Sequence, residues 1–161
     1  MNGVNKDATV NFLDFLPQSA IAVDLKSQSK KEVLKEMVQI LTEAHGIKNS
    51  SDILDALLER EELGSTGIGQ GIAIPHGKSE SAHKVTAALG ISKRGIDFDA
   101  LDGEPVYIFF MLVAPSNSAG VHLKILAKIS RLLKDKFFRQ ALREAKNPDE
   151  ILKLIKDENE Y

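Results

Sequence analysis

The chain of 161 residues contains no cysteine, and its charges nearly cancel. Without thiols it has no disulfide, no thiolate catalysis, no phosphocysteine and no cysteine-ligated zinc site, and it is compatible with a reducing cytosol. The 21 basic and 23 acidic side chains leave a net charge of -2, which gives no electrostatic footprint for nucleic acid or an anionic membrane. We therefore predict a cytoplasmic protein that does not bind nucleic acid.

Long apolar runs are absent as well. The longest one, Val106 to Ala114, is too short to cross a bilayer, and the segment Met1 to Asp14 is too polar for a signal peptide. We expect no insertion into a membrane. The length suits one hydrophobic core, so we predict a single domain over residues 1–161, with a core of about 11–157 and frayed termini.

Helical and extended patterns alternate along the chain. Ser29 and Glu32 form a capping box before a helix that ends at Gly46. The segment Val106 to Val113 has no alternation of polar and apolar residues, which indicates a strand covered by helices on both faces and hence an α/β layered architecture. The other predicted elements are strands at about 21–23 and 85–92, and helices at about 51–64, 118–134, 137–146 and from Pro148 onward, where Asn147 is the N-cap.

One segment breaks these local rules. The apolar run Ile72-Ala73-Ile74 stops at Pro75-His76-Gly77. Because proline removes a backbone donor and glycine frees the backbone, we expect the imidazole at a strand end, outside the hydrogen-bonded ladder. A histidine in such a position can act as a nucleophile, since much of it is neutral at physiological pH and keeps a free lone pair.

A glycine-rich loop, Gly64 to Gly71, directly precedes this segment. Its four glycines and two hydroxyl groups can turn several backbone N–H groups toward one anion. It matches neither a P-loop nor a dinucleotide fingerprint, because Gly71 leads into an apolar strand and not into a lysine or a helix. The alternative is an ordinary turn that joins a helix to a strand.

Two more residues are candidates for the same site. His122 shares the apolar stripe of its predicted helix, so it is either a core histidine or part of a cleft at the carboxyl edge of the sheet. Arg60 precedes the glycine loop and can offer a charged fork to a phosphate, although arginine is also common at helix C-termini. We interpret His45 and His83 as structural, and the spacing of histidines and acidic residues predicts no metal site.

The run Gly64 to Lys78, GSTGIGQGIAIPHGK, closely resembles the active-site signature of the enzyme IIA domains of the fructose/mannitol class. These domains belong to the phosphoenolpyruvate-dependent phosphotransferase system. The resemblance covers about Asn11 to Asp157 and is greatest to the nitrogen-regulatory branch of the class. It implies a mixed, mostly parallel sheet with helices on both faces.

The resemblance also implies roles for individual residues. His76 matches the histidine that accepts the phosphoryl group, His122 the second active-site histidine, and Arg60 the arginine near the phosphate. The donor would be a small phosphohistidine carrier protein, and no cofactor is implied. We expect the second nitrogen of His76 to be hydrogen-bonded, which fixes its tautomer. The loop residues that we expect to stabilise the phosphate are Ser65, Thr66 and Gly67.

Docking of the carrier needs a shallow apolar patch around the nucleophile, and the candidates are Ile68, Ile72 and Ile74, each of which is equally a candidate for the core. The acceptor is either a set of regulatory target proteins or a IIB component in sugar uptake. The GSTGIG form of the loop, and the end of the chain at Tyr161 without a IIB extension, favour the regulatory role. A module that senses an anion or a protein without being phosphorylated is an alternative of another class.

Overall fold

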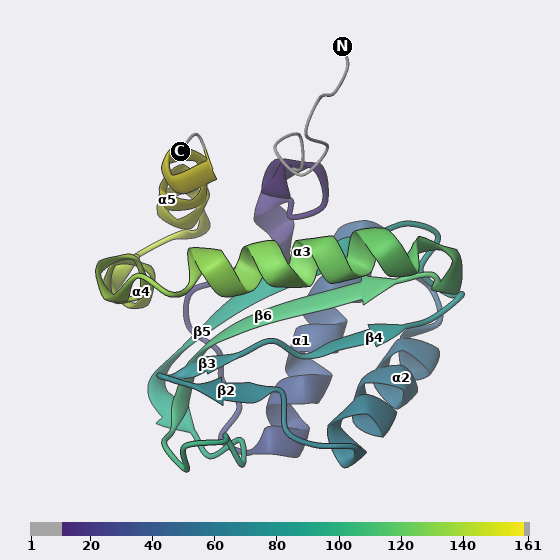
Figure 1. Ribbon diagram of the computed structural model, residues 1–161, viewed down its shortest axis with the longest axis horizontal. Coiled ribbons are helices and arrows are strands. Elements are labelled where there is room, and N and C mark those ends of the chain that lie inside the picture. Colours follow the sequence, from purple (N-terminus) through teal and green to yellow (C-terminus); the bar gives the residue numbers. More distant parts are fainter. Residues whose placement is uncertain (1–10, 160–161) are drawn as a thin grey trace.

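The computed structural model describes residues 11–159, in which one sheet lies between helices. The helices are α1 (Lys30–His45), α2 (Ser50–Glu62), α3 (Ala119–Leu132), α4 (Lys136–Glu144) and α5 (Pro148–Asn159), with 3-10 turns at Phe12–Asp14, Gln18–Ala20 and Ser116–Ser118. In Figure 1, α1 and α2 lie behind the sheet and α3 crosses its front. The predicted architecture, with helices on both faces, is confirmed. Within residues 11–159, every helix is too short or too polar to span a bilayer.

The sheet is mixed. Its strands are β1 (Ile21–Ala22), β2 (Gly67–Gly69), β3 (Ile72–Ala73), β4 (His76–Lys78), β5 (Thr86–Ile96) and β6 (Val106–Ala114). The order is β1-β5-β6-β3-β2, and β4 also pairs with β6. The pairings of β1 with β5, β3 with β6 and β4 with β6 are parallel, whereas β5 with β6 and β2 with β3 are antiparallel. Only Tyr107 of β6 is partly exposed, as its continuous apolar sequence predicts.

Local capping explains where the predicted helices begin and end. The Ser29 hydroxyl accepts a hydrogen bond from the Glu32 N–H and opens α1, and Gly46 closes that helix with a left-handed φ of 68°. The Asn147 side chain accepts a hydrogen bond from the Glu150 N–H at 2.9 Å before α5. These caps confirm the boundaries that the sequence predicts.

The prediction that His76 lies outside the ladder is wrong. It opens β4 and lies in register with Leu112 of β6, so the chain continues along the same neighbouring strand after Pro75. The pairing with β6 is interrupted only at Ile74 and Pro75, and the carbonyl of Pro75 still accepts a hydrogen bond from the Leu112 N–H at 2.9 Å. The histidine is therefore held by strand pairing on its backbone.

The glycine loop contains a short hairpin. β2 and β3 pair across a two-residue turn, Gln70-Gly71, in which φ is 59° and 79°. Two positive φ values in a two-residue connection are typical of a type I′ turn, and a glycine at the second position favours it. The segment is thus ordered by pairing with β3 and is more than a connection between helix and strand.

Candidate active site

His76 is half-buried, and its two ring nitrogens have different surroundings. Nδ1 lies 2.8 Å from the carbonyl oxygen of Ile74. Because a carbonyl can only accept, Nδ1 carries the hydrogen and Nε2 keeps the lone pair. Burial lowers the pKa of His76, and the positive charge of Arg60 lowers it further, against the hydrogen bond to Ile74 and the charge of Glu61. The ring is a neutral base with a directed lone pair.

His122 lies beside His76, in the first turns of α3. The ring centroids are 5.8 Å apart and the rings are inclined by 55°. Only 3% of His122 is exposed, and burial, together with the charges of His76 and Lys78, lowers its pKa to about 4. Among the described residues its Nε2 has no hydrogen-bond partner. Of the two interpretations left open by the sequence, the structure supports both at once, since this histidine is buried and also adjoins the candidate nucleophile.

Arg60 lies in the last turn of α2, near enough to His76 for its charge to lower that pKa. Its Nη1 donates to the carbonyl oxygen of Gly64 at 2.8 Å. The guanidinium has five N–H donors, so other donors remain for an anion beside His76.

The three loop residues predicted to bind phosphate, Ser65, Thr66 and Gly67, make hydrogen bonds within the protein. The Ser65 hydroxyl donates to the carbonyl of Phe98 at 3.0 Å and accepts from the Gly67 N–H at 3.0 Å. Both the N–H and the hydroxyl of Thr66 donate to the carboxylate of Glu61. These groups are therefore occupied by the fold, and the expectation that they bind phosphate stays a prediction.

Sequence reasoning assigned no role to Glu61, although its side chain is only 6% exposed. It forms an ion pair with Lys30 Nζ at 2.9 Å and accepts the two hydrogen bonds from Thr66. Its spacing of four and eight residues from Leu57 and Ile53, both buried, places it on the inner face of α2. A carboxylate in that apolar stripe is the signal that could have identified it.

The expected docking patch is only partly right. Ile68 is exposed, but Ile72 and Ile74 are buried in the core because both faces of the sheet are covered there. Val121 and Leu123, on either side of His122, are large exposed apolar residues that the sequence reasoning missed.

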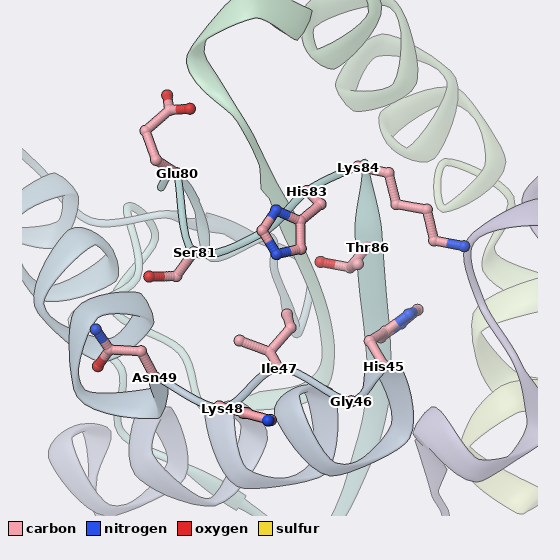
Figure 2. Close-up of a pocket in the computed structure, with 10 residues that line it drawn as sticks. All are labelled: His45, Gly46, Ile47, Lys48, Asn49, Glu80, Ser81, His83, Lys84 and Thr86. Atoms are coloured by element: carbon pink, nitrogen blue, oxygen red, sulfur yellow. The ribbon is translucent and has the colours of Figure 1, made fainter.

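A pocket of about 770 Å³ lies away from these residues (Figure 2). It is lined by His45, Gly46, Ile47, Lys48, Asn49, Glu80, Ser81, His83, Lys84 and Thr86. In Figure 2 the ring of His83 faces the hollow, whereas the amine of Lys84 points away from it. The His45 Nε2 donates to the carbonyl of Ala87 at 3.0 Å, in accordance with a structural role. No group of three or more potential metal-binding side chains is found in residues 11–159.

A family model described as "Phosphoenolpyruvate-dependent sugar phosphotransferase system, EIIA 2" matches residues 14–158. The chain belongs to this family. Membership confirms the resemblance of the GSTGIGQGIAIPHGK signature and implies a role in phosphoryl transfer.

The chain is similar to relatives with two kinds of name. It is 38% identical over 142 residues to a nitrogen regulatory protein of Bradyrhizobium diazoefficiens, covering 88% of this chain and 92% of the relative. It is 37% identical over 142 residues to the fructose-specific EIIABC component of Bacillus subtilis, covering 88% of this chain but 22% of that protein. Among solved structures, IIA-Ntr of Neisseria meningitidis aligns with a TM-score of 0.83 at 34% identity, covering 89% of this chain and 98% of that one. This last match confirms the predicted IIA fold.

Proposed function

We propose that the protein is a phosphoryl relay in which His76 Nε2 accepts a phosphoryl group from a phosphohistidine carrier protein. The observation that carries the proposal is the hydrogen bond from His76 Nδ1 to the Ile74 carbonyl, which leaves the lone pair on Nε2 of a ring that adjoins His122. In the transfer, the N–P bond of the donor breaks as the Nε2–P bond forms, and the donor imidazole leaves. No base is needed, because the attacking nitrogen is already unprotonated.

The second half of the relay uses the same hydrogen bond. After transfer the Nδ1 proton stays on the ring and faces the Ile74 carbonyl, so the ring of the phosphohistidine carries positive charge. A positively charged imidazole is a good leaving group, which favours passing the phosphoryl group on. Arg60 and His122 are positioned to stabilise the charge that spreads over the phosphoryl oxygens during transfer.

Exposed apolar side chains on or next to the elements that carry the site residues suit docking of a protein donor. Val121 and Leu123 flank His122, Ile68 lies in β2, and Leu63 follows α2. Leu63 is 84% exposed and Leu123 is 67% exposed. Burying such side chains against a partner is favourable at about 25 cal/mol per Å² of apolar surface, so these four residues form the donor surface that we propose in place of the patch expected from the sequence.

The proposed readout of the phosphorylated state is regulation of partner proteins in the cytoplasm. The similarity over nearly the whole length of two proteins named as nitrogen regulators supports it. Phosphate transfer to a IIB component in sugar uptake is the second candidate, and the similarity to a fructose-specific EIIABC component favours it. Incubation of the phosphorylated protein with sugar-specific IIB proteins separates the two, since efficient transfer would exclude the regulatory role.

The phosphotransfer itself is tested by intact mass. After incubation with phosphoenolpyruvate, enzyme I and the carrier, we expect one acid-labile phosphate on the protein and none on the His76→Ala variant. His83→Ala is the matched control and should be labelled like the wild type, because His83 is exposed and lines the pocket of Figure 2, to which His76 does not contribute. An unchanged mass of the wild-type protein would instead favour a module that senses an anion or a protein without being phosphorylated.

A further inference from the structure

The carboxylate of Glu61 connects three parts of the chain. Lys30, at the start of α1, donates to Oε2 at 2.9 Å. The N–H of Thr66 donates to Oε1 at 3.1 Å, and the hydroxyl of Thr66 donates to the same oxygen. Since Thr66 is itself buried, both ends of this contact are shielded from water. A buried carboxylate with this many donors is held in one position.

Two further hydrogen bonds extend from Thr66 to the nucleophile. The carbonyl of Thr66 accepts from the Ile74 N–H at 3.0 Å. The carbonyl of Ile74 accepts from His76 Nδ1 at 2.8 Å. The group that fixes the tautomer of His76 is therefore fixed by Thr66, and Thr66 is fixed by Glu61. Ile74 and Pro75 lie between β3 and β4 and are not paired with β6. The hydrogen bond to Thr66 therefore holds the backbone of Ile74 in place of that pairing.

We infer that Glu61 is a positioning residue for phosphoryl transfer, which acts through Thr66 and Ile74 to hold the imidazole of His76 with Nδ1 protonated and the lone pair on Nε2. The inference rests on the proposed function for the transfer itself. Arg60, the preceding residue, binds the loop at Gly64, so the last turn of α2 holds the loop at two points.

The charge of Glu61 also acts directly on His76. It raises the pKa of that ring, whereas the charge of Arg60 and burial lower it. The other titratable group beside His76 is His122 on α3, and Lys78 on β4 acts on His122. Removal of the negative charge leaves the positive ones unopposed, and the imidazole should then titrate at lower pH.

The test compares Glu61→Gln with Glu62→Gln in the full chain. Glutamine keeps an oxygen that can accept from Thr66 but has no charge, and Glu62 is an exposed neighbour in the same helical turn. NMR of the unphosphorylated protein reads the tautomer and the pKa of His76 without any transfer reaction. We expect Glu61→Gln to lower that pKa and to mix the tautomers, while Glu62→Gln leaves both unchanged.

Transfer kinetics provide the second measurement. We expect the rate constant of His76 phosphorylation at saturating carrier to fall by about tenfold to a hundredfold in Glu61→Gln, with an unchanged KM for the carrier. Thr66→Val, which removes the hydroxyl but keeps the backbone contacts, should give a smaller loss. Thermal melts of each variant identify any that does not fold.

The outcomes separate the two proposals. If the tautomer, the pKa and the rate constant in Glu61→Gln equal those of Glu62→Gln, Glu61 does not position the nucleophile. If the NMR changes occur but the wild-type protein accepts no phosphate, the positioning role is right and the proposed function is wrong. A raised KM with an unchanged rate constant would overturn the inference in favour of carrier docking.

Discussion

Mild acid should destabilise the protein through His122. Its pKa is about 4 in the folded state, because burial, His76 and Lys78 disfavour the imidazolium. In the unfolded chain the same ring titrates near its ordinary value of about 6.5. Between these two values the unfolded state binds more protons than the folded state. The free energy of unfolding therefore increases with pH across this window and decreases on acidification.

The magnitude follows from the two pKa values. A difference between 6.5 and about 4, at about 1.4 kcal/mol for each pKa unit, corresponds to about 3 kcal/mol of stability lost on acidification across the window. His76 and His45 act in the same direction, since burial lowers the pKa of both. Carboxylates such as Asp52, whose pKa is lowered by the hydroxyls of Ser79 and Ser81, lose their contribution only at lower pH, where they become protonated.

Urea unfolding at a series of pH values measures this effect. The wild type is compared with His122→Gln, which cannot titrate, and with His83→Gln, which removes an exposed histidine. Between about pH 7 and pH 4, the wild type and His83→Gln should lose about 3 kcal/mol more than His122→Gln. An identical pH dependence in all three proteins would refute the reasoning, because His122 would then bind its proton equally in both states.

Two substitutions test the packing and capping of the fold by the same urea assay. A Cβ added at Gly90 would lie 2.6 Å from Met37 Sδ and 2.8 Å from Leu25 Cδ1, so Gly90→Ala should cost about 1–3 kcal/mol, and an unchanged midpoint would show that the core has room there. Asn49→Ala removes the cap that accepts from the Asp52 N–H at 3.2 Å, so it should lower the free energy of unfolding by about 1 kcal/mol. A much smaller loss would mean that water replaces the cap.

Elements that depend on near neighbours could be predicted from the sequence. The caps at Ser29, Gly46 and Asn147 involve partners within five residues, and the apolar pattern of β6 depends on local composition alone. For the same reason the helix boundaries differ from prediction by only one or two residues. Such features require no knowledge of the distant parts of the chain.

Features that depend on partners far apart in the chain could not be predicted from the sequence. β4 was missed because Pro75 resembles the end of a strand, and only the parallel pairing with β6 shows that the ladder continues. The burial of Ile72 and Ile74 depends on helices that cover both faces of the sheet. The ion pair of Glu61 with Lys30 likewise depends on the packing of α1 against α2. A pattern of residue types contains no information on these pairings.

Several unfavourable features of the unphosphorylated site have one physical explanation. His122 buries a ring nitrogen that has no partner among residues 11–159, which costs about 1–3 kcal/mol. Positive charges at Arg60 and Lys78 oppose protonation of the two histidines. A phosphoryl dianion on His76 would reverse each of these effects, since it accepts hydrogen bonds, attracts the cations and favours a protonated His122. The site would therefore be more complementary to the phosphorylated state than to the free one, which suits the proposed relay.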